Sequence, residues 1–263
     1  MANGEERTVS FGGAVTTSNS RPLLLGHRGA RRVRKSWVPQ VSRSSRPGYS
    51  NSECAPVPAE NSIAAFDYAL ANGCDGFEFD VRYTRDCRAL ICHDPEFNGK
   101  TVAAAEHVEL DCLTCLEDVL ARFAATAYLD VELKVAGNEE AVVSALRARP
   151  PRRGYIVSSF LPEVLLRLHE IDPSLPLGYI CKDAEVVRRW TELPVSTFIP
   201  HHSLVSQVLV DEVHARNLQL LTWTVNHRRD LLRFAAWGVD GLISDDPKLL
   251  AETFPAMLAA HSG

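Results

Sequence analysis

The sequence predicts an α/β fold, a single (β/α)8, or TIM, barrel. From Leu23 onward, short apolar or β-branched segments alternate with segments whose apolar residues recur at helical spacing. One of the nine strand-like segments follows its predecessor after a short polar turn at residues 84–88, so the two should form a hairpin. Without it, eight strand–helix units fill about 240 residues, which is the number in a closed barrel. The alternative, a doubly wound open sheet, needs a glycine-rich first turn that this chain lacks.

Each expected element is placed by its own apolar pattern. In chain order, the strands are expected at Leu23–Gly26, Gly76–Arg82, Ala89–His93, Tyr128–Lys134, Tyr155–Ser159, Leu177–Ile180, Thr197–Pro200, Leu218–Val225 and Gly241–Ser244. Between them, apolar stripes predict helices around Ile63, Phe66 and Leu70, around Leu165, Leu168 and Ile171, around Val210 and Val213, and around Leu231 and Phe234. No internal repeat accompanies this alternation, so a single barrel accounts for the chain.

One domain, residues 21–263, is therefore expected, preceded by a flexible tail over residues 1–20. Residues 30–58 break the rhythm directly after the first strand: they hold six basic residues against one acid, Glu53, and are rich in serine and proline. This composition predicts a long polar inserted loop. Loops of this length in a compact domain are usually functional or disordered. A basic lid that binds anions or a membrane surface and a solvated insertion both remain open.

The overall composition excludes several classes of protein. Of the 263 residues, 46% are hydrophobic and 23% are charged, as in ordinary globular domains, and the net charge of −5 gives no general basic field for nucleic acid. No apolar run approaches the length of a membrane helix, and the first residues contain acids and no hydrophobic signal region. Seven cysteines without framework spacing favour reduced thiols. We expect a cytoplasmic protein with no stable membrane anchor and no nucleic-acid partner.

Two strands carry rows of charged residues on one side. Side chains two residues apart on a strand face the same way, so Glu78 and Asp80 share one face, and so do Asp130, Glu132 and Lys134. The apolar residues between them should pack outward against the helices, which turns both charged rows into the barrel. Buried carboxylates are costly unless a cation neutralises them, and carboxylates without thiolates suit Mg²⁺, Ca²⁺ or Mn²⁺. An internal salt-bridge network or an exposed strand face would explain the same pattern.

Two histidines stand at strand ends and strengthen the metal hypothesis. His27 follows the first strand, and His93 ends the expected hairpin. In a barrel these positions lie at the C-terminal rim, where active sites are built. Two imidazoles beside a carboxylate-held metal ion can serve as general acid and general base. Arg28 and Lys134 add anion-binding capacity, which indicates a phosphate-containing substrate.

With these residues in place, the sequence resembles a known family, the glycerophosphodiester phosphodiesterases. The matching segments occur in the family's order over nearly the whole chain: HRG (27–29), AENS (59–62), DGFEFDV (75–81), HDP (93–95), VELK (131–134), SSF (158–160), PHHSLV (200–205), TWTVN (222–226) and GVDGLISDDP (238–247). Each segment alone is weakly specific, but nine in order are strongly specific.

The resemblance implies a hydrolase that cuts glycerophosphodiesters, small-molecule substrates, into glycerol 3-phosphate and an alcohol. By this resemblance, a divalent ion (Mg²⁺ or Ca²⁺, with Mn²⁺ as a further candidate) is held by Glu78, Asp80 and Glu132. The general base and the general acid are His27 and His93, in an order the motif does not fix, and the phosphoryl oxygens contact Arg28 and Lys134. The resemblance also implies that Glu60 lies in or just behind the site and that the substrate end of the pocket is lined by Phe160 and Trp223.

The chain departs from the family in the length of the loop after HRG, which leaves the identity of the head group open. The sequence also leaves the ion and the oligomeric state open. A lysophospholipase D or sphingomyelinase D acting on a lipid-tailed diester is the alternative, with Trp37, Val38, Val41 and Tyr49 as an interfacial element. A non-catalytic barrel is a third hypothesis. It predicts the loss of a histidine or a ligand carboxylate, and all five are present.

Overall fold

The computed structural model describes residues 21–31, 57–185 and 187–255. The expected tail over residues 1–20 lies outside this range. So does the expected insertion, except for its two ends at residues 30–31 and 57–58.

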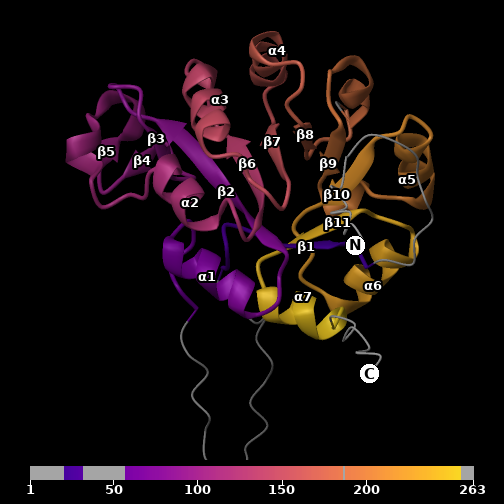
Figure 1. Ribbon diagram of the computed structural model, residues 1–263. Coiled ribbons are helices and arrows are strands. Elements are labelled where there is room, and N and C mark those ends of the chain that lie inside the picture. The colour runs from indigo at the N-terminus through magenta and orange to yellow at the C-terminus, as the bar shows by residue number, and fades with distance from the viewer. Residues whose placement is uncertain (1–20, 32–56, 186, 256–263) are drawn as a thin grey trace, which may run out of the picture.

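Eight parallel strands form a closed barrel, which confirms the predicted fold (Figure 1). In barrel order they are β1 (Leu23–Gly26), β2 (Gly76–Tyr83), β6 (Tyr128–Leu133), β7 (Tyr155–Ser159), β8 (Leu177–Cys181), β9 (Thr197–Pro200), β10 (Gln219–Thr222) and β11 (Gly241–Ser244). The first strand pairs with β11 on one side and with β2 on the other. Because this pairing leaves the ring without an edge, the open doubly wound sheet is excluded.

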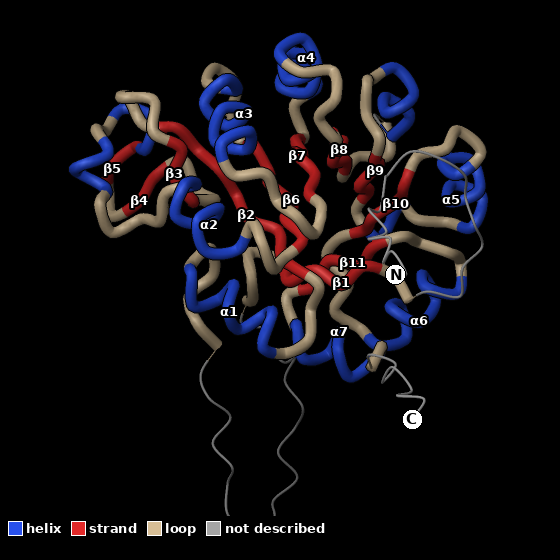
Figure 2. The backbone as a smooth tube through the Cα atoms, viewed as in Figure 1, coloured by secondary structure: helices blue, strands red, loops and turns tan. Residues whose placement is uncertain are grey.

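Helices surround the ring of strands, as the tube in Figure 2 shows. The α-helices are α1 (Ile63–Ala71), α2 (Leu116–Phe123), α3 (Glu139–Ala148), α4 (Pro162–Ile171), α5 (Gln207–His214), α6 (Arg228–Ala236) and α7 (Pro247–Thr253). After β8 the described chain forms a 3₁₀ helix, η3 (Val187–Glu192), in place of an α-helix. The barrel therefore has eight strand–helix units, and the fifth is shortened on its helical side.

The predicted hairpin is confirmed, because β3 (Ala89–Ile91) pairs antiparallel with β2. The chain then forms a small lobe before it enters α2. This lobe contains the strands β4 (Glu96–Phe97) and β5 (Lys100–Thr101) and the 3₁₀ helices η1 (Val102–Ala104) and η2 (His107–Leu110). Three expected strands end earlier than predicted, so that His93, Lys134 and Trp223 lie just beyond β3, β6 and β10. Their side chains thus start at the barrel rim.

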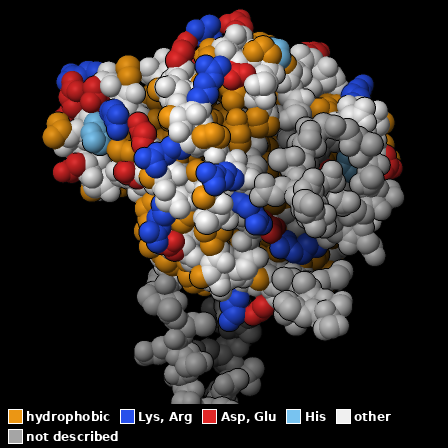
Figure 3. Space-filling model, in the orientation of Figure 1, with side chains coloured by type: hydrophobic (Ala, Val, Ile, Leu, Met, Phe, Trp, Pro, Cys, Tyr) orange, Lys and Arg blue, Asp and Glu red, His pale blue; other side chains and the backbone are white. Residues whose placement is uncertain are grey.

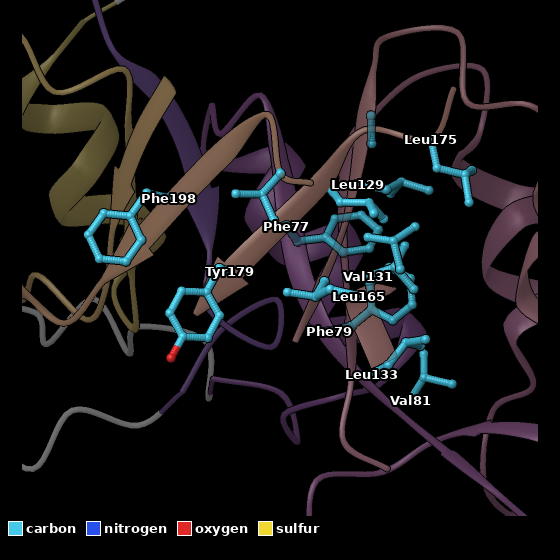
Figure 4. Packing of buried hydrophobic residues seen from close by; sticks show 14 of the residues in the cluster. Phe77, Phe79, Val81, Leu129, Val131, Leu133, Leu165, Leu175, Tyr179 and Phe198 are labelled. Carbon is cyan, nitrogen blue, oxygen red and sulfur yellow. The ribbon is translucent and has the colours of Figure 1, made fainter. Parts of the chain in front are cut away.

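The core lies mainly between the strands and the helices. Phe77 and Phe79 are fully buried on the outer face of β2, and the ring of Phe77 stacks on Phe66 of α1 at 4.2 Å. Figure 4 shows these side chains beside Leu129 and Val131 of the neighbouring strand. Burial of a side chain of this size stabilises the fold by roughly 1.5–3 kcal/mol. The apolar residues therefore face outward, as expected, and the charged rows of the same strands face inward.

The described surface mixes charges of both signs. On the face seen in Figure 3, Lys and Arg side chains alternate with Asp and Glu side chains. Among the residues that the structure describes, no helix is both long enough and apolar enough to span a bilayer. The described cysteines Cys74, Cys87, Cys92, Cys112, Cys115 and Cys181 are all free thiols, in line with the expected reduced state. The seventh, Cys54, lies outside the described range.

Candidate active site

The turn after β1 brings two side chains into the barrel mouth. Arg28 and Gly29 both have positive φ, at 50° and 77°. A β-carbon on Gly29 would lie 2.6 Å from the Ala65 carbonyl carbon, so only glycine fits against α1 there. The backbone N–H of Arg28 donates to Glu78 Oε2 at 2.9 Å. This tight turn places His27 and Arg28 next to the carboxylates of β2.

The predicted metal ligands Glu78, Asp80 and Glu132 come together. In the parallel register, Glu78 lies beside Asp130 and Asp80 lies beside Glu132, because alternate residues of β2 and β6 face inward at the same levels. One oxygen from each of the three predicted ligands lies within 4.8 Å of the others. All three side chains are buried. The arrangement is one that a hard divalent cation can bridge.

Burial and mutual repulsion strongly perturb these carboxylates. Burial, followed by the charges of Asp80, Glu132 and Asp130, raises the pKa of Glu78 well above its usual range. Burial and Asp80 also raise the pKa of Glu132 to about 7, although Lys134 opposes the shift. Burial raises the pKa of Asp130 to about 7, against the hydrogen bond from Ser158.

Two cations compensate part of this negative charge. Lys134 Nζ lies 2.5 Å from Glu132 Oε1 and 3.3 Å from Asp80 Oδ1. Arg28 Nε lies 3.1 Å from Asp80 Oδ2, and its NH1 donates to Glu60 Oε1 at 2.6 Å. Burial raises the pKa of Asp80, but Lys134 and Arg28 outweigh it and hold that pKa below its usual range. Glu60, half-buried, also pairs with Arg31, which places it behind Arg28.

His27 is held by a carboxylate on the opposite side of its ring. Its Nδ1 lies 2.6 Å from Asp245 Oδ1, a distance at which Nδ1–H donates to the carboxylate. Asn226 donates to the other oxygen of Asp245 at 2.6 Å and accepts from Ser244 and from the Asp245 backbone. Burial raises the pKa of Asp245, but the hydrogen bond and the charge of His27 outweigh burial and hold that pKa below its usual range. With Nδ1 engaged, Nε2 is the nitrogen left for chemistry, 3.7 Å from Glu78 Oε2.

His93 lies at the edge of the same cavity. Its backbone carbonyl accepts from Arg82 Nε at 2.8 Å, and its Nδ1 lies 2.7 Å from Asp94 Oδ1. Partial burial lowers the pKa of His93, and the hydrogen bond with Asp94 and the charge of Asp80 only partly offset this. The His93 side chain is about one third exposed, whereas that of His27 is almost fully buried.

The cavity has a volume of about 260 Å³ and joins these groups to an apolar wall. Phe160 and Trp223 meet edge to face at 5.5 Å on that wall, and the Trp223 indole N–H donates to the Ile199 carbonyl at 3.2 Å. Lys134 Nζ lies 5.6 Å from the centre of the Phe160 ring. The cavity lining contains His27, Arg28, Glu78, His93, Asp130, Glu132, Lys134, Phe160, Ile180, Lys182, Ile199, Trp223 and Ile243.

The structure thus gathers the predicted site residues around one cavity. Asp80 and Glu60 do not line it but contact residues that do. Sequence reasoning missed Asp245 and Asn226, although both lie inside segments of the family resemblance. It also missed Asn61, whose amide donates to Asp80 Oδ2 at 2.7 Å. The available signal was that each of these polar residues lies within or next to a rim segment at 59–62, 222–226 or 238–247.

Comparison with known proteins gives the same assignment. The sequence model described as "Glycerophosphoryl diester phosphodiesterase family" matches residues 27–112 and 97–249. A glycerophosphodiester phosphodiesterase from Caldanaerobacter subterraneus is 28% identical over 219 residues, which cover 73% of this chain and 90% of that protein.

Solved structures support the fold. A phosphodiesterase from Oleispira antarctica, in complex with the product sn-glycerol-3-phosphate, superposes with a TM-score of 0.71 at 19% identity and covers 89% of this chain and 96% of that one. A glycerophosphodiester phosphodiesterase from Agrobacterium tumefaciens gives a TM-score of 0.71 at 20% identity, covering 88% and 98%. Since the family match spans most of the chain, this protein belongs to the glycerophosphoryl diester phosphodiesterase family of phosphoric diester hydrolases.

Proposed function

We propose that the protein hydrolyses glycerophosphodiesters to glycerol 3-phosphate and a free alcohol, with a divalent metal ion and two histidines. The observation that carries the proposal is that the cluster of Glu78, Asp80 and Glu132 lies at one cavity of the barrel mouth, whose lining also contains two imidazoles and cationic side chains. Each group suits a need of the reaction: anchoring a metal ion, moving protons and binding a phosphoryl group.

The carboxylate cluster fits a divalent cation. Glu78 Oε1 is buried and has no hydrogen-bond partner among the described residues, and an orphaned carboxylate oxygen is costly unless a cation meets it. Glu78, Asp80 and Glu132 would hold the ion, and their all-oxygen donor set suits Mg²⁺, Ca²⁺ or Mn²⁺. When bound, the ion would supply Lewis-acid stabilisation of charge on the phosphoryl oxygens.

Arg28 and Lys134 would bind the phosphoryl group. Burial alone would lower the pKa values of both side chains. The nearby carboxylates outweigh burial, so both pKa values are raised. Both side chains therefore stay charged. Each can turn from its carboxylate partner towards a non-bridging oxygen of the substrate. Charge-assisted hydrogen bonds of this kind are stronger than neutral ones and grow as charge builds up in the transition state.

The histidines would move the protons. As a water or hydroxyl oxygen forms its bond to phosphorus, one imidazole takes its proton; as the phosphorus–oxygen bond to the alcohol breaks, the other gives a proton to the leaving oxygen. One ring must then be neutral and the other protonated in the active enzyme. Histidine allows both states near neutral pH, so kcat/KM should follow a bell-shaped pH profile.

A direct assay tests the proposal. Release of glycerol 3-phosphate from glycerophosphoethanolamine and glycerophosphocholine is measured with Mg²⁺, Ca²⁺ or Mn²⁺ and with EDTA. We expect metal-dependent release that EDTA abolishes. Failure of the folded protein to release glycerol 3-phosphate with any of the three ions would contradict the proposal.

The alternative with a lipid-tailed diester used Trp37, Val38, Val41 and Tyr49, which lie outside the described residues. It stays a prediction of the sequence. Parallel assays with lysophosphatidylcholine and glycerophosphocholine separate the two: the proposal expects the water-soluble diester to have the higher kcat/KM, and the reverse order would support the lipid enzyme.

Asp245 is predicted to act as a positioning residue for His27. Asp245→Asn keeps the size of the side chain but removes the charge that holds the Nδ1–H tautomer and stabilises the imidazolium. We expect kcat to fall about 10- to 100-fold, which is the usual loss when a residue that orients a functional histidine through a hydrogen bond is removed. The pH profile of kcat/KM should change as well. An Asp240→Asn variant, which removes the carboxylate beside His214 outside the cavity, is the control and should leave the profile unchanged.

A further inference from the structure

Lys182 lines the cavity but has no part in the chemistry proposed above. It directly follows β8, whose last residue is Cys181. Counted around the barrel from β1, β8 is the fifth of the eight strands. Its carboxyl end therefore faces that of β1 across the mouth. Lys182 thus lies on the opposite side of the cavity from His27 and Arg28.

The surroundings of Lys182 leave its charge uncompensated within the cavity. The acids in the lining are Glu78, Asp130 and Glu132, and all of them come from β2 and β6. The apolar part of the lining is Phe160, Ile180, Ile199, Trp223 and Ile243. His201, which follows the neighbouring strand β9, also lies near Lys182: burial, the charge of His202 and the charge of Lys182 all lower the pKa of His201. Lys182 is itself exposed, and no ion pair among the described residues includes it. The next residue along the chain, Asp183, is exposed and does not line the cavity.

We propose that Lys182 forms a subsite for an anionic group on the alcohol arm of the substrate. This inference rests on the proposed function. With the phosphoryl group between Arg28 and Lys134, the proposal places the alcohol arm of the diester along the wall of Phe160 and Trp223. A cavity of about 260 Å³ holds a head group of only a few heavy atoms, so the end of that arm comes close to Lys182.

The preferred substrates are then glycerophosphodiesters whose alcohol carries a carboxylate or a phosphate. Aromatic rings alone would also accept a quaternary ammonium such as choline. Lys182 reverses that preference, because a cationic head group would meet a second positive charge and no compensating carboxylate on this wall.

A matched substrate pair tests the subsite. Glycerophosphoserine and glycerophosphoethanolamine differ only in the carboxylate of the head group. We expect the wild-type protein to favour the serine diester by about three- to tenfold in kcat/KM, as for a partly solvated ion pair. In Lys182→Gln this ratio should fall towards one, and in Lys182→Glu it should invert. A second pair is glycerophosphoglycerol with and without a terminal phosphate. It shows whether a phosphate on the alcohol raises kcat/KM through Lys182 as a carboxylate does.

Asp183→Asn is the control for general surface charge. It changes the net charge of the same segment by one unit without altering the cavity lining, so the serine-to-ethanolamine ratio should stay at the wild-type value. If Asp183→Asn raised the ratio as much as Lys182→Gln lowered it, or if Lys182→Gln left both ratios unchanged, the subsite would be refuted. If the wild-type protein hydrolysed none of the four diesters with any metal ion, the proposed function itself would fail.

Discussion

Replacement of His27 or His93 by alanine should lower kcat/KM for a glycerophosphodiester by two to four orders of magnitude, which is the usual contribution of a positioned acid or base. Both rings line the cavity, and each is oriented through Nδ1 by an aspartate. Steady-state kinetics with a saturating metal ion measures the loss. The double variant should be little slower than the slower single variant, because groups that act in one proton-transfer cycle are not additive.

The control for these variants is His169→Ala. His169 lies in the last turn of α4 and does not line the cavity, so kcat/KM should stay at the wild-type value. Circular dichroism and the thermal midpoint must show that all variants remain folded. Since His27 is buried, loss of its ring also leaves Asp245 Oδ1 without its donor, although Asn226 still donates to Oδ2. His27→Gln keeps a donor near that position. Wild-type rates in His27→Ala and His93→Ala would exclude acid–base catalysis by these rings.

The sequence was sufficient to predict the barrel and to place the candidate site residues at one rim of it, for a physical reason. Alternation on β2 and β6 separates two faces of each strand: Phe77, Phe79 and Val81 pack in the core against the helices, which turns Glu78 and Asp80 inward. In a parallel barrel, residues at strand ends then meet at one rim. Local periodicity and barrel closure together therefore locate Glu132, His27 and His93 without knowledge of any contact.

Features that depend on contacts between distant segments could not be predicted from the pattern. The hydrogen bond of His27 to Asp245 joins residues 218 positions apart, and Asn226 reaches the same carboxylate from a third segment. Nothing local to these residues distinguishes them from ordinary polar caps of strands. The 3₁₀ helix after β8 was likewise not predicted: the count of eight strand–helix units implies a helix there, but no apolar stripe in the segment indicates its type. The position of Lys182 also depends on distant segments, because it lies opposite Arg28 only in the closed barrel. The sequence pattern alone therefore assigned it no function.

Removal of the metal ion should have the second large effect, and Glu78→Gln should reproduce it. A bound ion contributes several kcal/mol to transition-state charge stabilisation, so EDTA should lower kcat by about a thousandfold or more. Glu78→Gln keeps the side-chain volume but removes one anionic ligand, and its activity should require a much higher metal concentration. Glu139→Gln is the matched control: Glu139 is also buried, but it accepts from the Gly137 N–H outside the cavity.

The same ion should control the pH dependence of stability. The pKa values of Glu132 and Asp130 are raised to about 7, above their ordinary values near 4, so the stabilising contribution of each group is fully present at low pH and is lost as pH rises through 7. Without metal, the thermal midpoint should therefore fall from about pH 4 to about pH 7 and level off above it. A divalent ion replaces the protons on the ligand carboxylates, and its affinity rises as those protons leave.

Thermal unfolding with EDTA and with each metal ion, at pH 6 and at pH 8, measures this coupling. At a metal concentration of about 100 times Kd, binding contributes about 2.7 kcal/mol, or roughly 5–10 °C for a chain of this size. The increase should be larger at pH 8 than at pH 6 and should disappear in Glu78→Gln but not in Glu139→Gln. An increase of zero at both pH values would leave the carboxylates as an internal network neutralised by Lys134 and Arg28. That network would then have to explain why Glu78 Oε1 is buried with no hydrogen-bond partner among the described residues. A bound cation accounts for this oxygen directly, and the difference between pH 8 and pH 6 decides between the two.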